Sequence, residues 1–338
     1  MDPAGRRPTI GDLAREAGVS PSTASRAMSG GGYVAAAVRV RVQEAAERIG
    51  YVPDTVARSL RHRTTKAIGV LISDLRNPFY ADVATAVEQR LRAEGFHIIL
   101  ANSDGLVDEE RAAVTLFMGS RVAGVIMAPV SPIASRLADA GVPTVEFDRQ
   151  MVPGRCDAVL LENEDGARIG TEHLVGWGHR RIGLLLGEMS WSTGPERLAG
   201  YRAALDAAGL PFDPALLVHG IAHPTEPEHL ARRLLEQAPD VTAIFATNNL
   251  MAEEAIMEIQ RRGMRIPDDI SLVAFDDIPW MSIVQPGITA VAQPTLEIGR
   301  RAAERLLARM TGARTEEPDV TRLAPTLVVR GSVGPPRS

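Results

Sequence analysis

From residue 66 onward, short apolar runs alternate with longer stretches whose apolar residues recur at helical spacing. The short runs are continuously apolar, which is typical of strands buried on both faces of a parallel sheet. Strands that alternate with helices predict an α/β, doubly wound fold. The predicted strands are 68–73, 97–101, 124–128, 144–147, 158–161, 182–186, 243–246 and 271–275, and the predicted helices are 79–94, 109–118, 166–175, 196–208, 228–237 and 251–262.

Three pairs of segments in this part of the chain resemble each other. They are 67–71 with 181–185, 125–129 with 243–247, and 145–148 with 273–276. Two lobes of similar plan would produce this repetition. A further helical pattern at 291–311 indicates that the chain returns to the first lobe near its end. We therefore expect lobe 1 to comprise 66–161 and 291–321, and lobe 2 to comprise 162–290 and 322–330.

The first 62 residues have a different pattern, with three short amphipathic helices and no strand signal. Thr9 and Asp12 have the spacing of a capping box at the start of the first helix. Ser20 can cap the second helix, since Pro21 follows at the first helical position, where proline is tolerated. Gly18 permits the tight turn between the two helices. The third helix is predicted over 35–49, so this segment is predicted to be an all-α helix-turn-helix domain.

The outer face of the second predicted helix is small, polar and basic. Ser22, Ser25, Arg26 and Ser29 fall on this face at helical spacing, whereas Ala24 falls on the opposite, inward face. Such a face suits entry into the major groove of DNA. The alternative interpretation is an ordinary helical hairpin whose outer face is merely solvated.

Residues 51–63 contain a possible two-turn helix that Asp54 can cap. An isolated helix of this length is unstable in water, so it should form only against a partner. Leu60 is an apolar residue among arginines. It could pack on the following domain, or it could act as a wedge in the minor groove of DNA.

The charge distribution supports a nucleic-acid-binding head on a different kind of body. The chain has 338 residues, enough for two or three domains. Residues 1–66 carry a net charge of +5, and the remainder carries −10. The single cysteine, Cys156, excludes a disulfide framework. With no run of 18 apolar residues and no signal-peptide pattern, we expect a cytoplasmic protein without membrane contact.

Polar residues follow many of the predicted strands, where ligands bind in doubly wound folds. Carboxylates and amides can bind hydroxyl groups, and aromatic rings can cover the apolar faces of a sugar. The alternative is that these strand-end groups cap the helices that follow. The groups considered include Asp74, Asn102, Asp148, Arg149, Glu188, Trp191, Arg197, Asn248, Asn249, Asp276 and Asp277.

No catalytic motif is apparent, so we expect neither an enzyme nor a cofactor. The chain has no Walker sequence, no G-x-S-x-G and no G-x-G-x-x-G after a strand. His219, His223 and His229 are close together, but the stretch contains two prolines and no predicted helix orders it. We therefore expect no metal site.

Seven motifs together resemble the lac repressor/galactose repressor family of bacterial transcription regulators, and the resemblance covers essentially the whole chain. The motifs are Val19-Ser20-x-x-Thr23-x-Ser25-Arg26, Gly50-Tyr51-Val52-Pro53, Ala57-Arg58-Ser59-Leu60, Asn77-Pro78-Phe79-Tyr80, Gly178-His179-x-x-Ile182, Arg197-x-x-Gly200-Tyr201 and Phe275-Asp276-Asp277. The resemblance implies a helix-turn-helix domain joined to a two-lobed, doubly wound, periplasmic-binding-protein-like domain.

The resemblance also implies partners and site residues. The partners would be a pseudo-palindromic double-stranded DNA operator, a small sugar-like effector and a second copy of the chain, forming a homodimer. The implied DNA contacts are Ser20, Pro21, Ser22, Thr23, Ser25, Arg26, Ser29, Tyr33, Asp54, Ala57 and Leu60. The implied effector contacts are Phe79, Asp148, Arg197, Asn248 and Asp276.

The sequence departs from the family pattern at several positions. Asp54 stands where the family usually has asparagine, and Ala35 and Val38 replace a serine and a threonine. Asn249 replaces an aspartate. The first three changes favour weaker or effector-dependent DNA binding. Our main hypothesis is a transcriptional repressor controlled by a sugar-like effector, and the alternative is a solute sensor or binding protein with a weakened DNA-binding head.

Overall fold

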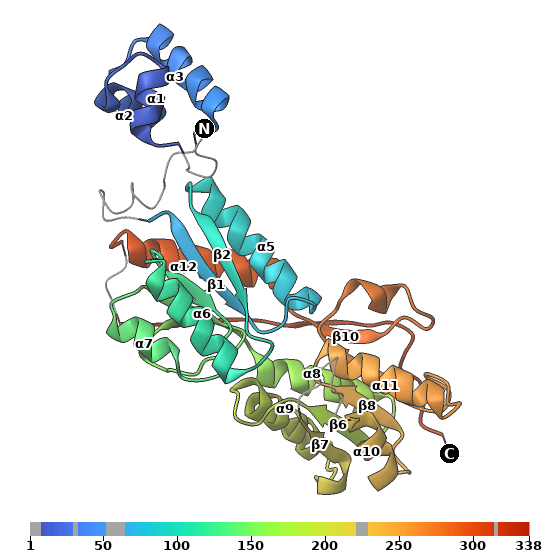
Figure 1. The fold of residues 1–338 in the computed structure, drawn as a ribbon. Helices are drawn as coiled ribbons and strands as arrows, with labels where there is room; N and C mark the ends of the chain where they lie inside the picture. Colours follow the sequence, from blue (N-terminus) through green and yellow to red (C-terminus); the bar gives the residue numbers. More distant parts are fainter. Residues whose placement is uncertain (1–7, 30–32, 52–64, 221–228, 314–316, 338) are drawn as a thin grey trace. The chain divides into compact units, whose positions relative to one another are not determined.

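The computed structural model describes residues 8–29, 33–51, 65–220, 229–313 and 317–337 (Figure 1). It divides the chain into two compact units, Met1–Thr65 and Lys66–Ser338. Within the described ranges, no helix has the length and apolar character needed to cross a membrane.

The N-terminal unit contains three helices, α1 (Ile10–Glu16), α2 (Pro21–Ser29) and α3 (Ala36–Ile49). The predicted capping box is present, because Thr9 and Asp12 each accept a hydrogen bond from the other's backbone N–H. Gly18 adopts a φ of 62° in the turn between α1 and α2. The core of this small unit is formed by Leu13, Ala14, Ala17, Ala24, Ala27, Val42, Ala45 and Ala46.

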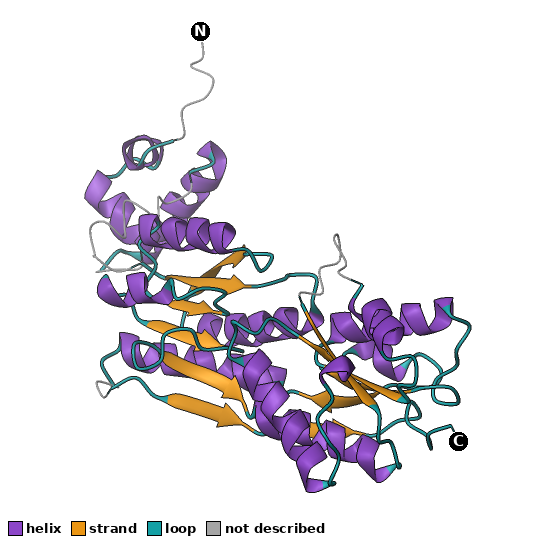
Figure 2. Cartoon of the chain, turned by 90° about the horizontal axis from the view of Figure 1, so that it is seen from below, coloured by secondary structure: helices purple, strands orange, loops and turns teal. Residues whose placement is uncertain are grey.

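The larger unit contains two six-stranded sheets (Figure 2). We call the first sheet with its helices lobe 1, and the second with its helices lobe 2. Sheet 1 has the order β11-β5-β4-β3-β1-β2, and sheet 2 the order β12-β10-β9-β8-β6-β7. All neighbouring strands are parallel except β10 and β12. The strands are β1 Ala67–Ile72, β2 His97–Asn102, β3 Val125–Met127, β4 Thr144–Phe147, β5 Asp157–Leu161, β6 Ile182–Leu186, β7 Leu217–His219, β8 Ala243–Ala246, β9 Ser271–Phe275, β10 Thr289–Ala292, β11 Val320–Leu323 and β12 Thr326–Val328.

Each sheet is covered by helices and has an apolar core on both faces. In lobe 1, α5 and α12 lie on one face, and α6 and α7 on the other. In lobe 2, α8 and α9 lie on one face, and α10 and α11 on the other. The helices are α5 Pro78–Ala93, α6 Val107–Gly119, α7 Ala134–Asp139, α8 Asn163–Gly176, α9 Thr193–Ala207, α10 Leu230–Gln237, α11 Asn249–Arg261 and α12 Thr295–Met310. The predicted fold class is confirmed.

Three connections join the sheets: β5 to β6, β10 to β11, and β11 to β12. The prediction of a helix over 291–311 was wrong at its start, because β10 continues to Ala292 and α12 begins at Thr295. Strand β10 ends at Ala292, two residues past the predicted lobe boundary at 290. Strand β11 ends at Leu323, two residues past the predicted boundary at 321. The hydrophobic pattern also did not predict β7, β11, β12 or α7, all of which are short.

Candidate functional site

The exposed face of α2 carries the residues predicted to contact DNA. Ser22, Arg26 and Ser29 are exposed, and Ser25 is half-buried. Ala24 and Ala27 face the core and hold α2 against α1 and α3. The Nε of Arg26 donates to the backbone carbonyl of Ser22 at 3.2 Å, so the guanidinium lies along the outside of the helix.

The start of α2 is fixed by the hydroxyl of Ser20. Its Oγ accepts a hydrogen bond from the backbone N–H of Thr23 at 3.2 Å and contacts the hydroxyls of Ser22 and Thr23. Pro21 occupies the first helical position and is exposed, and Tyr33 is 93% exposed. The remaining predicted DNA contacts, Asp54, Ala57 and Leu60, lie outside the described residues.

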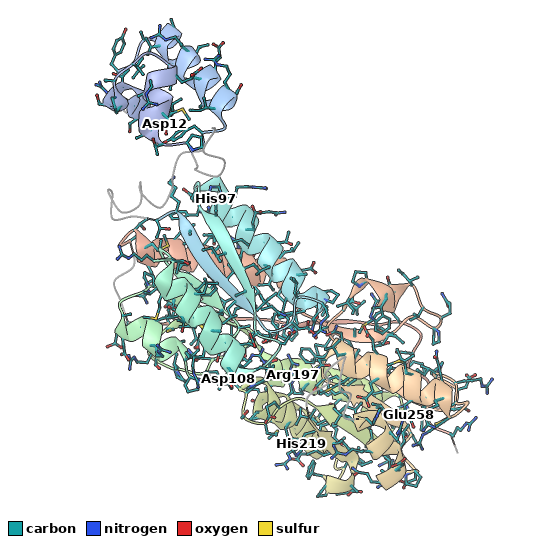
Figure 3. All side chains as sticks on the ribbon, in the orientation of Figure 1. Asp12, His97, Asp108, Arg197, His219 and Glu258 are labelled. Atoms are coloured by element: carbon teal, nitrogen blue, oxygen red, sulfur yellow. The ribbon has the colours of Figure 1, made fainter. Side chains whose placement is uncertain are left out.

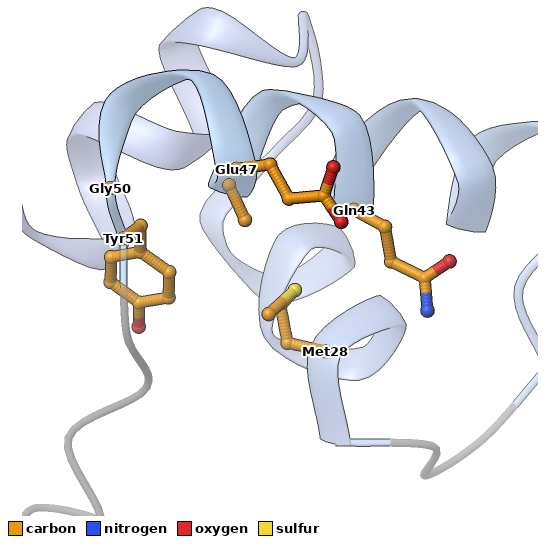
Figure 4. A pocket seen from close by; sticks show the side chains of 6 residues that line it. Met28, Gln43, Glu47, Gly50 and Tyr51 are labelled. Carbon is orange, nitrogen blue, oxygen red and sulfur yellow. The ribbon is translucent and has the colours of Figure 1, made fainter.

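A surface pocket of about 550 Å³ lies in the same unit (Figure 4). It is lined by Met28, Gln43, Ala46, Glu47, Gly50 and Tyr51. None of these residues belongs to the predicted DNA contacts, and the carboxylate of Glu47 would repel a phosphate group. The pocket therefore adds nothing to the predicted DNA-reading face.

In the larger unit, the repeated sequence pattern becomes a repeated backbone geometry. Asp148 directly follows β4 of sheet 1, and Asp276 directly follows β9 of sheet 2. Both have positive φ angles, 66° and 70°, a conformation that aspartate tolerates better than most residues. The two carboxylates thus occupy equivalent ends of the two sheets.

In lobe 2, Arg197 is buried on α9 and lies where the lobes adjoin (Figure 3). Its Nε donates to Asn163 Oδ1 at 2.9 Å, and its Nη1 donates to the carbonyl of Thr247 at 2.5 Å. The guanidinium lies 3.9 Å from the centre of the Phe275 ring. Burial lowers the pKa of Arg197, although the charges of Asp276 and Asp148 oppose this shift. Asp148 of lobe 1 is thus near enough to Arg197 of lobe 2 to affect its pKa.

Asp276 of lobe 2 is also buried. Gln293 donates from its Nε2 to Asp276 Oδ1 at 2.6 Å. Burial raises the pKa of Asp276, while the positive charge of Arg197 and the hydrogen bond from Gln293 oppose the increase. Asp277 points to a different partner and forms a bidentate ion pair with Arg330 at 2.7 and 2.9 Å. The adjacent aspartates therefore do not form a carboxylate pair.

In lobe 1, Asp148 belongs to a network that the sequence analysis did not predict. The Tyr80 hydroxyl donates to Asp148 Oδ2 at 2.8 Å. Arg149, only 2% exposed, donates from Nη2 to the Tyr80 hydroxyl at 2.9 Å and to the Ser73 hydroxyl. Burial raises the pKa of Tyr80, so its hydroxyl keeps its proton. Arg149 directly follows Asp148 at the end of a strand, and this position was the signal in the sequence that could have linked Arg149 to the network.

Two of the predicted effector contacts have clear structural roles. Asn248 caps α11, because its Oδ1 accepts a hydrogen bond from the backbone N–H of Met251 at 2.8 Å. This is the helix-capping alternative that the sequence left open. Phe79 is 4% exposed within the core of lobe 1, and its ring packs edge-on against Tyr80 at 4.9 Å. Effector binding by these two residues remains a prediction.

Direct contacts join the two lobes near these charges. Asn77 donates from its Nδ2 to Asn249 Oδ1 at 3.0 Å. The backbone N–H of Gln150 donates to the hydroxyl of Ser192 at 3.2 Å. The guanidinium of Arg149 lies 3.9 Å from the centre of the Trp191 ring. The carboxyl ends of the two sheets therefore face each other, with two arginines and two aspartates between them.

Both parts of the chain are similar to known protein families. Residues 9–54 match the model of bacterial regulatory proteins of the lacI family, and residues 171–333 match a periplasmic binding protein-like domain. The HTH-type transcriptional regulator CelR of Thermobifida fusca is 36% identical over 321 residues, covering 92% of this chain and 94% of CelR. The chain belongs to the lacI family. This lacI-family chain is therefore a DNA-binding transcription regulator and not an enzyme, and the resemblance seen in the sequence is confirmed.

Solved structures of lacI-family proteins agree with this assignment. A complex of CelR with cellobiose has a TM-score of 0.73 and 34% sequence identity, covering 96% of this chain and 100% of CelR. A Lac repressor dimer bound to operator and the anti-inducer ONPF has a TM-score of 0.79 and 27% identity, covering 97% and 100% of the two chains. Because the similarity includes the DNA-binding domain, the alternative of a solute-binding protein is not favoured.

The departures from the lacI-family pattern have visible consequences in α3. Ala35 stands at the N-cap position of α3 and provides no side-chain hydrogen bond. Val38 instead packs partly against the core of the N-terminal unit. The missing cap leaves the first N–H groups of α3 without a side-chain acceptor.

Proposed function

We propose that this lacI-family protein is a cytoplasmic repressor that binds a pseudo-palindromic operator as a homodimer and responds to a sugar-like effector. The observation that carries the proposal is the pair of strand-end aspartates, Asp148 and Asp276, which face each other with two buried arginines in a chain that also has a DNA-reading helix. The dimeric, operator-bound Lac repressor supports the first part of the proposal, and the cellobiose complex of CelR supports the second.

For DNA binding, α2 would lie in the major groove of each half-site. Pro21, Ser22 and Arg26 would face the bases, because they lie on the exposed side of the helix. Ser20, Thr23, Ser25, Ser29 and Tyr33 would contact phosphates or groove edges. Asp54, Ala57 and Leu60 would belong to a short helix that pairs with its counterpart in the minor groove, where Leu60 would be the wedge.

For effector binding, Asp148, Arg197, Asn248 and Asp276 would contact a small ligand between the lobes, with Phe79 nearby. Carboxylates accept hydrogen bonds from hydroxyl groups, and arginine and asparagine donate to hydroxyl or ring oxygens. Such a set of donors and acceptors suits a sugar better than an apolar compound.

The effector would act by shifting a population between two states. If it binds better to one degree of lobe closure, it favours that state in proportion to its differential affinity. Closure would set the separation of the two copies of the segment 54–62, and hence the affinity for the operator. Effector and operator affinities would then be coupled reciprocally.

The test is in vitro selection of randomised duplex DNA with the purified full-length protein, followed by titration with cellobiose and other sugars. We expect an enriched palindrome with a fixed central step, and an affinity for it that changes when the effector is added. Enrichment only in the presence of a sugar would identify a corepressor instead of an inducer. If no DNA is enriched under either condition, the proposal is wrong.

A further inference from the structure

Asn249 is a buried residue whose amide orientation is fixed by its neighbours. The Oδ1 of Asn77 caps α5 by accepting a hydrogen bond from the backbone N–H of Phe79 at 3.0 Å. The amide nitrogen of Asn77 must therefore point away from the helix, and it donates to Asn249 Oδ1 at 3.0 Å. This cap fixes which end of each amide is the donor and which is the acceptor.

The amide nitrogen of Asn249, Nδ2, forms no hydrogen bond within the described structure. Asn249 is 0% exposed, and its Nδ2 has no hydrogen-bond partner among the described residues. A buried donor without an acceptor is unfavourable, so such a group points to a missing acceptor. Its backbone N–H donates to Asp276, which places Asn249 beside the candidate effector contacts.

A second unused donor lies on the opposite lobe. The Nε of Arg149 is buried and also has no partner among the described residues, whereas its Nη2 is held by Ser73 and Tyr80. The two donors therefore flank the junction from both sides. The charges of Arg149, Arg197, Asp148 and Asp276 formally cancel, so the surroundings favour a neutral ligand with several oxygen atoms over an anion.

We propose that Asn249 determines effector specificity by donating a hydrogen bond from its Nδ2 to an oxygen of a neutral, hydroxyl-rich effector. The proposal rests on the proposed function, because it assumes that an effector binds between the lobes. An aspartate at this position, which is usual in the family, would still accept from Asn77 but would offer no donor. The side chain at 249 thus selects for an acceptor on the ligand.

Three variants of the full-length protein separate the possible roles of Asn249. N249D keeps the acceptor for Asn77 and removes the donor. N249L removes both without adding charge. N77S keeps the cap of α5, because serine is a good N-cap, but is too short to reach Asn249. Binding of cellobiose and a panel of neutral mono- and disaccharides is measured by calorimetry, and operator affinity without sugar is measured in parallel.

We expect N249D and N249L to weaken binding of the sugar that the wild type prefers by about tenfold or more, and N77S to change it by less than about threefold. If N249L and N77S bind the sugar more weakly while N249D binds it like the wild type, Asn249 only bridges the lobes. This result would overturn the proposal. Weaker sugar binding by N249D alone would show that Asp276 repels the new carboxylate, and this result would also overturn the proposal.

Binding by the wild type separates this proposal from the proposed function. If the wild type binds its operator but none of the neutral saccharides, the proposed role of Asn249 is wrong while the DNA-binding function stands. If it selects no operator, the proposed function itself fails. N249A replaces N249L as the neutral variant if N249L does not fold.

Discussion

At the scale of single residues, the structure separates exposed polar side chains from those buried in the fold. Arg26 is exposed on α2, and the contact of its guanidinium among the described residues is the backbone carbonyl of Ser22, which is consistent with its proposed contact with a base. Arg149 and Arg197 are both buried, and each donates hydrogen bonds to neutral partners. Arg149 also forms an ion pair with Asp148 at 3.6 Å. The junction of the lobes thus holds guanidinium donors and carboxylate acceptors, which a polar ligand would use.

Replacing Arg26 by alanine should reduce discrimination at one base pair of each half-site by about 1–3 kcal/mol, because the bidentate contact of an arginine with a base would be lost. Operator affinity is measured against single-base variants of the selected site. Arg15→Ala is the matched control, since Arg15 is exposed on α1 and pairs with Asp12. Equal loss of affinity on every sequence would show that Arg26 contacts only phosphates.

Glu146 should make the stability of lobe 1 depend on pH. Burial raises the pKa of Glu146 from 4.5 to about 7, and the nearby charge of Glu110 adds to the increase. Because the folded pKa is the higher one, the stabilisation is complete below pH 4.5 and is lost as the pH rises through 7. The loss should reach roughly 3 kcal/mol.

Denaturant unfolding of wild type and Glu146→Gln between pH 4 and 9 tests this expectation. The variant should lose most of the pH dependence in this range, because its amide does not titrate. Glu109→Gln is the control, since Glu109 is exposed on α6. An unchanged pH profile in Glu146→Gln would mean that the carboxyl titrates at its ordinary pKa.

At the scale of secondary-structure elements, close packing of helices depends on particular glycines. Gly200 of α9 faces α8, and a Cβ there would lie 2.0 Å from the carbonyl oxygen of Glu164 and 2.9 Å from the backbone nitrogen of Arg168. The sequence motif contained this glycine, but only the packing of α8 on α9 explains it. The two helices approach through their backbones, so no side chain can move aside.

Gly200→Ala should therefore destabilise lobe 2 by about 3 kcal/mol, because a core that is overpacked against backbone cannot relax. The free energy of unfolding is measured in denaturant. Gly176→Ala at the end of α8 is the matched control, as a Cβ there meets nothing within 4 Å and alanine is the better helix former. Equal stability of the two variants would contradict the close approach.

At the scale of the whole molecule, a basic N-terminal segment is joined to an acidic remainder. Residues 1–66 carry a net charge of +5, and residues 67–338 carry −10. The two parts serve different partners, so a variant of one should leave the binding reaction of the other intact. Asp276 lies in the body, where its carboxylate is held by Gln293. It is the position at which the proposed coupling between effector and operator is best interrupted.

Asp276→Asn should abolish the effect of the effector on operator affinity, because the carboxylate proposed to accept hydrogen bonds from effector hydroxyl groups is lost while the shape of the side chain is kept. Operator affinity without effector should stay within about threefold of wild type. Both are measured by fluorescence anisotropy with the selected operator. Asp268→Asn, which changes an exposed carboxylate of lobe 2, should respond like wild type. A response that survives in Asp276→Asn would mean that the effector binds elsewhere.

The order of amino acids was enough to predict the elements with strong local patterns, the all-α N-terminal domain and the family. Apolar runs predicted eight strands because buried parallel strands need no alternation, and the repeat predicted that Asp148 and Asp276 are equivalent. Short strands such as β7 and β12 were not predicted, because three residues are too few to show a hydrophobic pattern. Their identity as strands comes from pairing with a neighbour.

Which polar side chains meet depends on how distant segments pack. Asn77 and Asn249 are 172 positions apart, and Tyr80 and Asp148 are 68 apart, so no local pattern links them. The structure also showed that Asn248 caps a helix and that Phe79 is buried in a core, whereas the sequence allowed either residue to face a ligand. Local chemistry fixes what a side chain can do, and the packing of distant segments fixes the partner with which it does so.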